Sequence, residues 1–201
     1  QRAGTAVLRL ANAEVVPFHF PGLTETLARY RDEVKSLLNQ RRDAALERNR
    51  QLDEGVFTAL SDPREPTRPP ARADIAPALN FAPLDNALTE WRRSAERYET
   101  AFARLDRTPA GAELNRLLRR VERALGDSAG LPRRPWYQHL LYAPGFYTGY
   151  GVKTLPGIRE AIEQGYWAEA EREAARVATS LGKAARLVDS AAALLEGAPG
   201  Q

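Results

Sequence analysis

Apolar residues recur every three or four positions through four long stretches of the chain, which is the spacing of one face of an α-helix. We expect helices over Leu23–Leu52, Leu84–Leu105, Pro109–Leu125 and Trp167–Leu195. The second stretch keeps this spacing throughout, with Leu84, Leu88, Trp91, Ala95, Tyr98, Phe102 and Leu105. Helices with such faces bury them against one another, so the pattern predicts an all-α fold, an antiparallel four-helix bundle.

Two segments fall outside the helical pattern. Residues 1–20 carry apolar residues without a clean period, and Pro17 and Pro21 prevent a long helix at their end. We expect a short helix or strand there, followed by an extended lead-in. Residues 62–83 contain six prolines, which predicts an extended, exposed connector between two helices.

A third segment, residues 127–157, is dense in glycine, proline and aromatic residues and precedes the last helix. Pro135, Pro144 and Pro156 prevent a helix from running through it, and its aromatic content is unlike that of disordered segments. We therefore expect a long ordered loop, a kind of loop that is usually functional. One or two helical turns, Gly157–Glu163, should follow. Apolar residues outside the helical faces are candidates for a second contact, such as Trp136, Phe146 and Leu155.

The charge pattern limits the possible partners. The chain has 201 residues, of which 29 are basic and 26 acidic, and its net charge is +3. Arginine pairs such as Arg92–Arg93 are interleaved with acidic residues, as on solvated helix faces, and do not form the basic face that binds nucleic acid. No apolar run approaches the roughly 20 residues that span a bilayer, and no signal-peptide pattern is present. We expect neither a nucleic-acid partner nor a membrane segment.

The sequence also lacks the usual signatures of catalysis. The motifs of serine hydrolases, P-loops, dinucleotide-binding folds and zinc metalloproteases are all missing. There is no cysteine, and the two histidines, His19 and His139, lie far apart in the chain. A zinc site normally takes about three or four protein ligands. We therefore expect no catalytic residues, metal site or cofactor here, and a structural role for His139. Because the chain begins with Gln1 and has no methionine, we also expect a piece of a longer protein.

The central loop contains a string of glycine, proline and aromatic positions with specific spacing. These positions are Gly130-Leu131-Pro132, Arg134-Pro135, Tyr137, His139, Tyr142-Ala143-Pro144, Tyr150 and Pro156-Gly157-Ile158. With this string, residues 130–163 resemble the C-terminal segment of the transferrin-receptor-like dimerisation domain. That domain closes the glutamate carboxypeptidase-like zinc peptidases and the transferrin receptor. Weaker matches extend over most of the chain, at Leu10-Ala11-Asn12, Val16-Pro17-Phe18, Leu114-Asn115 and Glu122-Arg123-Ala124.

The resemblance implies a helical domain that forms the homodimer of a larger enzyme. Residues 1–20 would be the lead-in from a missing protease domain. Residues 21–201 would be the dimerisation domain, with the connector at 62–83 and the central loop at 127–157. The zinc ions of such peptidases are bound in the protease domain, so this chain would be inactive alone. Its implied partners are a second copy, the protease domain and, in the full-length protein, a peptide substrate.

Two alternatives stay open at this point. A homologue that has lost catalysis would use the same bundle as an interaction module, as the transferrin receptor does, and a stand-alone helical adaptor would need no upstream domain. An upstream di-zinc set of His, Asp and Glu favours the enzyme, whereas an initiator methionine directly before Gln1 favours the adaptor. The compartment is open as well; the arginine-rich, alanine-rich composition suggests a GC-rich bacterium, with a secreted or cell-envelope location as one expectation.

The resemblance also assigns candidate site residues to the central loop. In the family this loop reaches the protease active site, where a lysine-tyrosine pair helps to hold the terminal glutamate side chain of the substrate. The tyrosine falls on Tyr150, but the lysine falls on Gly149, which leaves the specificity open. Lys153 is the nearby candidate for the cation, and Tyr150 could alternatively be a packed loop residue. Further loop or interface candidates are Trp136, Tyr137, His139, Tyr142, Phe146 and Tyr147.

Overall fold

The computed structural model describes residues 2–59, 64, 68–104 and 111–197, and most of them are helical. The helices are α1 (Arg2–Ala11), α2 (Phe20–Asp53), α3 (Val56–Ala59), α4 (Ala82–Ala103), α5 (Gly111–Ala124), α6 (Pro156–Gln164) and α7 (Trp167–Glu196). Two short strands lie between α5 and α6, namely β1 (Tyr142–Pro144) and β2 (Val152–Thr154). The predicted all-α helical fold is confirmed. The short N-terminal helix and the helical turns before the last helix are also present.

Local sequence explains where several helices begin and end. A proline lies in the first turn of α2, α4 and α6, namely Pro21, Pro83 and Pro156. Backbone N–H groups in a first turn have no partner within the helix, so the missing N–H of proline costs no hydrogen bond there. Helix α6 ends at Gln164, and Gly165 follows as its C-cap, where the φ of 74° suits a residue without a Cβ. The predicted start of α5 at Pro109 and the end of α4 at Leu105 lie outside the described residues.

The core lies between α7 and the helices packed around it, α4, α5 and α6, and includes the buried face of α2. Trp91 is fully buried, and its indole Nε1–H donates to the hydroxyl of Thr24 at 2.9 Å. Phe20 packs edge-on against both Trp91 and Tyr98, with centroid distances of 5.6 and 5.1 Å. The predicted face of α4 is therefore mostly internal. Phe102 is an exception, because it lies in the last turn of α4, stacked on Tyr98, and is 39% exposed.

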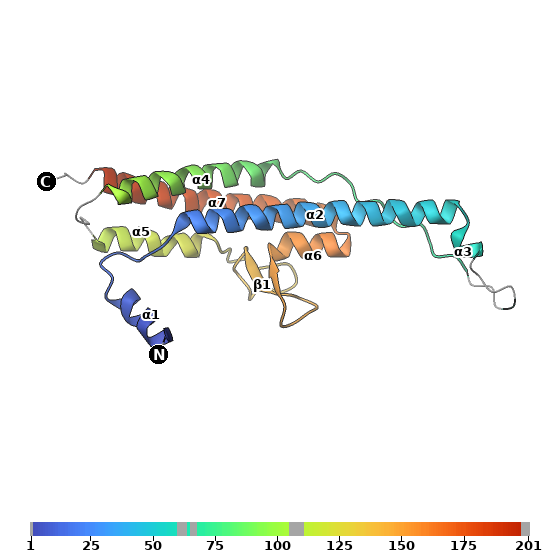
Figure 1. Ribbon diagram of the computed structural model, residues 1–201, viewed down its shortest axis with the longest axis horizontal. Coiled ribbons are helices and arrows are strands. Elements are labelled where there is room, and N and C mark those ends of the chain that lie inside the picture. Colours follow the sequence, from blue (N-terminus) through green and yellow to red (C-terminus); the bar gives the residue numbers. More distant parts are fainter. Residues whose placement is uncertain (1, 60–63, 65–67, 105–110, 198–201) are drawn as a thin grey trace.

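The bundle is not antiparallel at every pair of neighbours. Lys35 of α2 pairs with Asp85 at the start of α4, whereas Thr24 contacts Trp91 further along α4, so α2 and α4 run in opposite directions. Helices α4 and α7 run in the same direction. At one end Asn80, just before α4, donates its backbone N–H to Glu171 at 2.8 Å, and at the other Arg97 pairs with Glu196 at 2.6 Å. The chain returns between them through α5, the central loop and α6, which lie end to end along α7 (Figure 1).

Residues 68–81 of the Pro-rich connector are extended, as expected, but they are not simply exposed. They run back along the second half of α2 (Figure 1). The Asn49 side chain exchanges two hydrogen bonds with the backbone of Ala73, at 2.8 and 2.9 Å, and Arg42 donates to the carbonyl of Ala76 at 2.9 Å. Ala76 and Phe81 are buried. The connector therefore covers part of α2, because polar side chains of that helix hydrogen-bond its backbone.

Helix α1 stands apart from the bundle and is joined to it by residues 12–19 (Figure 1). The side chain of Asn115 in α5 holds this lead-in, accepting the N–H of Val16 at 2.7 Å and donating to the carbonyl of Glu14 at 2.7 Å. Val7 and Leu8 on α1 are 64% and 63% exposed. Within the described ranges, no helix combines the length and apolar character that crossing a bilayer requires.

Candidate functional site

The central loop contains a β-hairpin that the sequence analysis did not predict. Strands β1 and β2 pair antiparallel, with Tyr142 opposite Thr154 and Pro144 opposite Val152. The hairpin tip, defined here as Gly145–Gly151, is closed by the Gly145 N–H donating to the carbonyl of Gly151 at 2.8 Å. The hairpin projects from the side of the bundle between α5 and α6 (Figure 1).

Arg134 fixes the base of the hairpin to α6. Its buried guanidinium donates to both carboxylate oxygens of Glu160, at 2.8 and 2.9 Å, and to the carbonyl of Pro144. The same carboxylate accepts the N–H of Phe146 at 2.9 Å. The guanidinium carbon also lies 5.5 and 5.8 Å from the ring centroids of Tyr137 and Phe146. One arginine therefore ties together the loop, the end of β1 and α6.

Arg176 of α7 holds the beginning of the loop. Its guanidinium donates to the carbonyl of Gly130 at 2.8 Å, pairs with Asp127 at 3.2 Å and pairs with Glu173 at 2.8 Å. Glu173 lies so close to Gly157, in the first turn of α6, that a Cβ on Gly157 would overlap its carboxylate. A carboxylate is favourable beside a helix N-terminus, although burial raises the pKa of Glu173 above its usual value. The close approach of Glu173 thus explains why position 157, in the Pro-Gly-Ile motif, is a glycine.

The Gly-Leu-Pro motif forms a tight turn that only a glycine can begin. Gly130 has a φ of 68°, and a Cβ there would overlap the backbone of Pro135. Arg133 in the same turn also has a positive φ, of 63°. Its guanidinium pairs with Glu169 of α7 at 2.7 Å and lies 5.4 Å from the ring centroid of Tyr166. Three arginines, at positions 133, 134 and 176, therefore hold the loop against α6 and α7.

His139 lies at the base of the hairpin, in the position of a structural residue. Its Nδ1 accepts the backbone N–H of Leu141 at 3.3 Å, and its ring centroid is 4.2 Å from that of Tyr142. Its Nε2 is buried, 3.5 Å from a carboxylate oxygen of Glu122. Burial lowers the pKa of His139 below its usual value, and Glu122 offsets only part of that shift. The neutral imidazole is the form that accepts the Leu141 hydrogen bond.

The predicted loop aromatics lie on the surface of the hairpin and its base. Trp136 is 71% exposed and Tyr147 64% exposed, and Tyr150 at the tip is fully exposed. The prediction that Leu155 is available for a second contact is wrong. Leu155 lies at the start of α6, is 2% exposed and belongs to the core. The other candidates are less exposed than Tyr150 but still reach solvent, and they are Tyr137, His139, Tyr142 and Phe146.

The two predicted substrate-binding residues lie in different surroundings. The ammonium of Lys153, in β2, is 2.6 Å from a carboxylate oxygen of Glu163 in α6, so its charge is already paired. Tyr150 is fully exposed and therefore makes no packing contact with Lys153. Gly149, beside it, has a φ of 65° and open space around the position of a Cβ. Within the described residues, the recorded charge partner of Lys153 is therefore Glu163 and not Tyr150.

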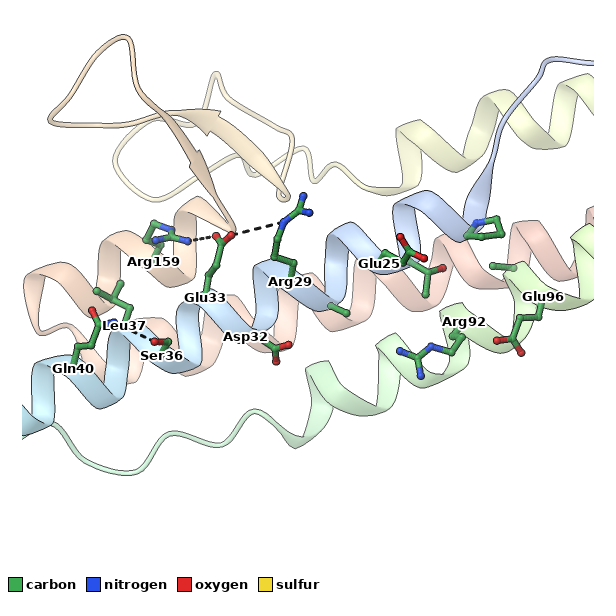
Figure 2. A pocket seen from close by; sticks show the side chains of 14 residues that line it. Glu25, Arg29, Asp32, Glu33, Ser36, Leu37, Gln40, Arg92, Glu96 and Arg159 are labelled. Carbon is green, nitrogen blue, oxygen red and sulfur yellow. Dashed lines mark hydrogen bonds and ion pairs between the residues drawn. The ribbon is translucent and has the colours of Figure 1, made fainter.

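A groove of about 970 Å³, which periodicity did not reveal, runs between α2 and α4. Figure 2 shows Glu25, Arg29 and Asp32 of α2 along one side, with Arg92 and Glu96 of α4 on the other. The groove carries charges of both signs, and apolar residues such as Leu37 and Ala95 also line it. In the part of the chain that the structure describes, no group of three or more His, Cys, Asp or Glu could hold a metal ion.

Comparison with known proteins shows that the part of the chain with the hairpin and its arginine anchors matches a protein family. A model of the transferrin receptor-like dimerisation domain matches residues 79–189, more than half of the chain. This range contains α4, α5, the central loop and α6, together with most of α7.

Three curated relatives are similar to parts of the chain. A probable glutamate carboxypeptidase of Arabidopsis thaliana is 38% identical over 85 residues, which is 42% of this chain and 12% of the relative. A probable glutamate carboxypeptidase of Arthroderma benhamiae is 28% identical over 118 residues, 57% of this chain and 16% of the relative. An inactive zinc metalloprotease of Schizosaccharomyces pombe is 30% identical over 101 residues, 50% of this chain and 12% of the relative.

The chain therefore spans only a small part of the length of the curated relatives it matches. The match to the family nevertheless covers helices α4 to α6, most of α7 and the anchored hairpin. The chain belongs to the transferrin receptor-like dimerisation domain family.

Proposed function

We propose that this chain is the C-terminal homodimerisation domain of a glutamate carboxypeptidase-like zinc exopeptidase, and that its hairpin completes the substrate pocket of the protease domain. The observation that carries the proposal is the family match over residues 79–189. This match includes the part of the bundle formed by α4 to α7, which would take part in the dimer, and the hairpin, which would reach the active site. Two of the relatives are named probable glutamate carboxypeptidases, which supports a peptidase as the parent.

The construction of the hairpin supports a contact beyond the bundle. Trp136, Tyr147 and Tyr150 are exposed, although large aromatic side chains gain most from burial. Their base is held by buried and half-buried ion pairs to α6 and α7. A binding element of this kind needs a rigid support, because the side chains that contact a ligand must be held in position. The hairpin combines exposed aromatics with such a support.

The catalytic chemistry would belong to the missing domain. The zinc ions and their ligands would lie in the protease domain, where zinc activates water for peptide hydrolysis. This chain would contribute binding surface. The exposed apolar residues Val7 and Leu8 of α1 suit a contact with that domain, since the lead-in is pinned to α5 through Asn115 while α1 stands away from the bundle.

Three measurements test this proposal. In analytical ultracentrifugation the chain should self-associate, with a concentration-dependent dimer. A strict monomer at high concentration would contradict the dimerisation role. With added zinc the isolated chain should not cleave peptides, and measurable turnover would contradict the assignment of catalysis to another domain. In the full-length protein, Tyr150→Ala should change KM or kcat for peptide substrates, whereas unchanged kinetics would remove the hairpin from the pocket.

A non-catalytic parent is the second candidate, because one relative is named an inactive zinc metalloprotease. In that case the same bundle would serve as a dimerisation and interaction module. Metal analysis of the purified full-length protein separates the two. Bound zinc together with peptide hydrolysis supports the enzyme, and a metal-free, inactive protein that still dimerises supports the module.

A further inference from the structure

The hairpin tip is aromatic and carries no charge. Residues 145–151 read GFYTGYG, and their three large side chains, those of Phe146, Tyr147 and Tyr150, all reach solvent. Phe146 and Tyr147 pack edge-on, with a centroid distance of 4.8 Å. Any ligand that the tip covers would therefore meet aromatic rings, phenol hydroxyls and backbone.

Every lysine and arginine of the central loop is already paired with a carboxylate of α6 or α7. Arg133 binds Glu169 at 2.7 Å, Arg134 binds Glu160 at 2.8 Å, and Lys153 binds Glu163 at 2.6 Å. These three are all the lysines and arginines in residues 127–157. Each carboxylate partner lies outside the tip, so these pairs direct the cations toward the helices. The loop offers no uncompensated positive charge to a ligand.

We propose that the tip receives an uncharged apolar or aromatic side chain of the substrate, in place of a glutamate side chain. This inference rests on the proposed function, in which the tip forms one wall of the substrate pocket. A glutamate carboxylate pressed against this wall would lose its hydration without gaining a cation, which is unfavourable. The Tyr150 hydroxyl can donate one hydrogen bond, but a single hydrogen bond does not replace a charge partner.

Aromatic rings could also attract a cationic side chain through their faces. The tip nevertheless has no carboxylate, and Glu163 beside the hairpin is engaged by Lys153. A lysine or arginine side chain would thus contact aromatic rings without a carboxylate partner, and it would lose part of its hydration. An apolar or aromatic side chain loses no charge hydration and gains contact with the exposed rings of the tip. This comparison favours an uncharged side chain over both charged classes.

The test uses the full-length zinc-containing protein and four acetylated dipeptides that differ only in the last residue: Ac-Ala-Phe, Ac-Ala-Leu, Ac-Ala-Glu and Ac-Ala-Lys. We expect kcat/KM for the Phe and Leu peptides to exceed that for the Glu and Lys peptides by at least about tenfold. Calorimetric titration with N-acetyl-phenylalanine and N-acetyl-glutamate gives a second readout that needs no turnover, and the phenylalanine compound should bind more tightly.

A matched pair of variants tests whether the tip determines this substrate preference. Gly149→Lys adds a cation beside Tyr150, where a side chain has open space, and Gly149→Ala imposes the same left-handed backbone without a charge. Relative to Gly149→Ala, Gly149→Lys should raise kcat/KM for Ac-Ala-Glu by about tenfold, because a paired carboxylate is favoured. It should not raise kcat/KM for Ac-Ala-Leu, because an added charge gives an apolar side chain no favourable contact.

The outcomes separate this inference from the proposed function. If Tyr150→Ala alters the kinetics but Ac-Ala-Glu or Ac-Ala-Lys is the best substrate, the tip contacts substrate and the inference is wrong. If neither Tyr150→Ala nor the Gly149 variants alter hydrolysis or binding of any of these compounds, the hairpin is not part of the pocket and the proposed function fails with the inference. Tighter binding of N-acetyl-glutamate than of N-acetyl-phenylalanine also overturns the inference.

Discussion

The Arg134 guanidinium donates to both carboxylate oxygens of Glu160, at 2.8 and 2.9 Å, and both side chains are almost fully buried. The pair joins the base of the hairpin to α6. It is surrounded by further hydrogen bonds from Phe146 and to Pro144. A buried pair of this kind fixes one geometry, because neither group can leave its partner without becoming an unpaired buried charge.

Removing one member of this pair should strongly destabilise the fold. Arg134→Met or Glu160→Gln leaves its partner buried without a full counter-charge, which should lower the free energy of unfolding by about 3–5 kcal/mol. Urea denaturation of the chain measures the change. The double variant Arg134→Met/Glu160→Leu leaves no charge unpaired and should recover part of the loss. Single variants within about 1 kcal/mol of wild type would show that the pair does not anchor the hairpin.

Two glycines with similar φ angles should respond differently to alanine. Gly130→Ala combines a φ of 68° with overlap against Pro135 and should cost at least about 2 kcal/mol of stability. Gly149→Ala has a φ of 65° but open space, so it should cost only about 1 kcal/mol, the left-handed conformation alone. Thermal unfolding of both variants checks the difference. Equal losses would contradict a steric role for Gly130.

The hydrogen bond between Thr24 and Trp91 should contribute to the packing of α2 on α4. Thr24→Val keeps the shape of the side chain but leaves the buried indole N–H without its acceptor, which should cost about 1–3 kcal/mol. Thr24→Ser keeps the hydroxyl and serves as the matched control, with a smaller loss. Chemical denaturation distinguishes them, and a loss in Thr24→Val no larger than that in Thr24→Ser would contradict a contribution of the hydrogen bond to stability.

The stability of the hairpin base should fall at acidic pH because of His139. Burial lowers the pKa of His139 in the folded chain below its usual value of 6.5. The unfolded chain therefore binds the proton more readily than the folded chain. The contribution of neutral His139 to stability is complete above pH 6.5 and is lost as the pH falls through the lower pKa of the folded chain. Protonation of Nδ1 also removes the acceptor for the Leu141 N–H.

His139→Asn tests this dependence, because an asparagine oxygen can accept the Leu141 N–H without titrating. The melting temperature of wild type should fall more steeply than that of the variant between about pH 6.5 and pH 5. Carboxylates elsewhere titrate equally in both proteins, so the difference between the two curves isolates His139. Parallel curves would show that His139 does not titrate in this range.

The helices could be predicted because their apolar spacing is itself a consequence of the packing they form. The face of α4 from Leu84 to Tyr98 is buried almost as its period indicates. The direction of the helices could not be predicted in this way, because a period carries no information on neighbours. The parallel pair of α4 and α7 follows instead from the return of the chain through α5 and α6.

The hairpin and the ion pairs that anchor it could not be predicted from the sequence, for different reasons. Each strand has three residues, too few for an alternating pattern, and β1 ends in Pro144. Glu160 and Glu173 are charged residues that the helical period would leave in solvent, yet both are buried. Glu160 pairs with Arg134, which is distant in the sequence, whereas Glu173 pairs with its near neighbour Arg176. The aromatic string of the loop was the signal that sequence could supply, since its spacing reflects these turns.

Because α4 and α7 run in the same direction, the chain must travel back along the bundle before it can begin α7. The hairpin interrupts this return path between two helices that are each seated on α7. We therefore expect the exposed part of the tip, beyond Phe146, to tolerate changes of composition while the registers of α5 and α6 stay fixed. Such changes would alter the surface of the hairpin with little effect on the stability of the bundle.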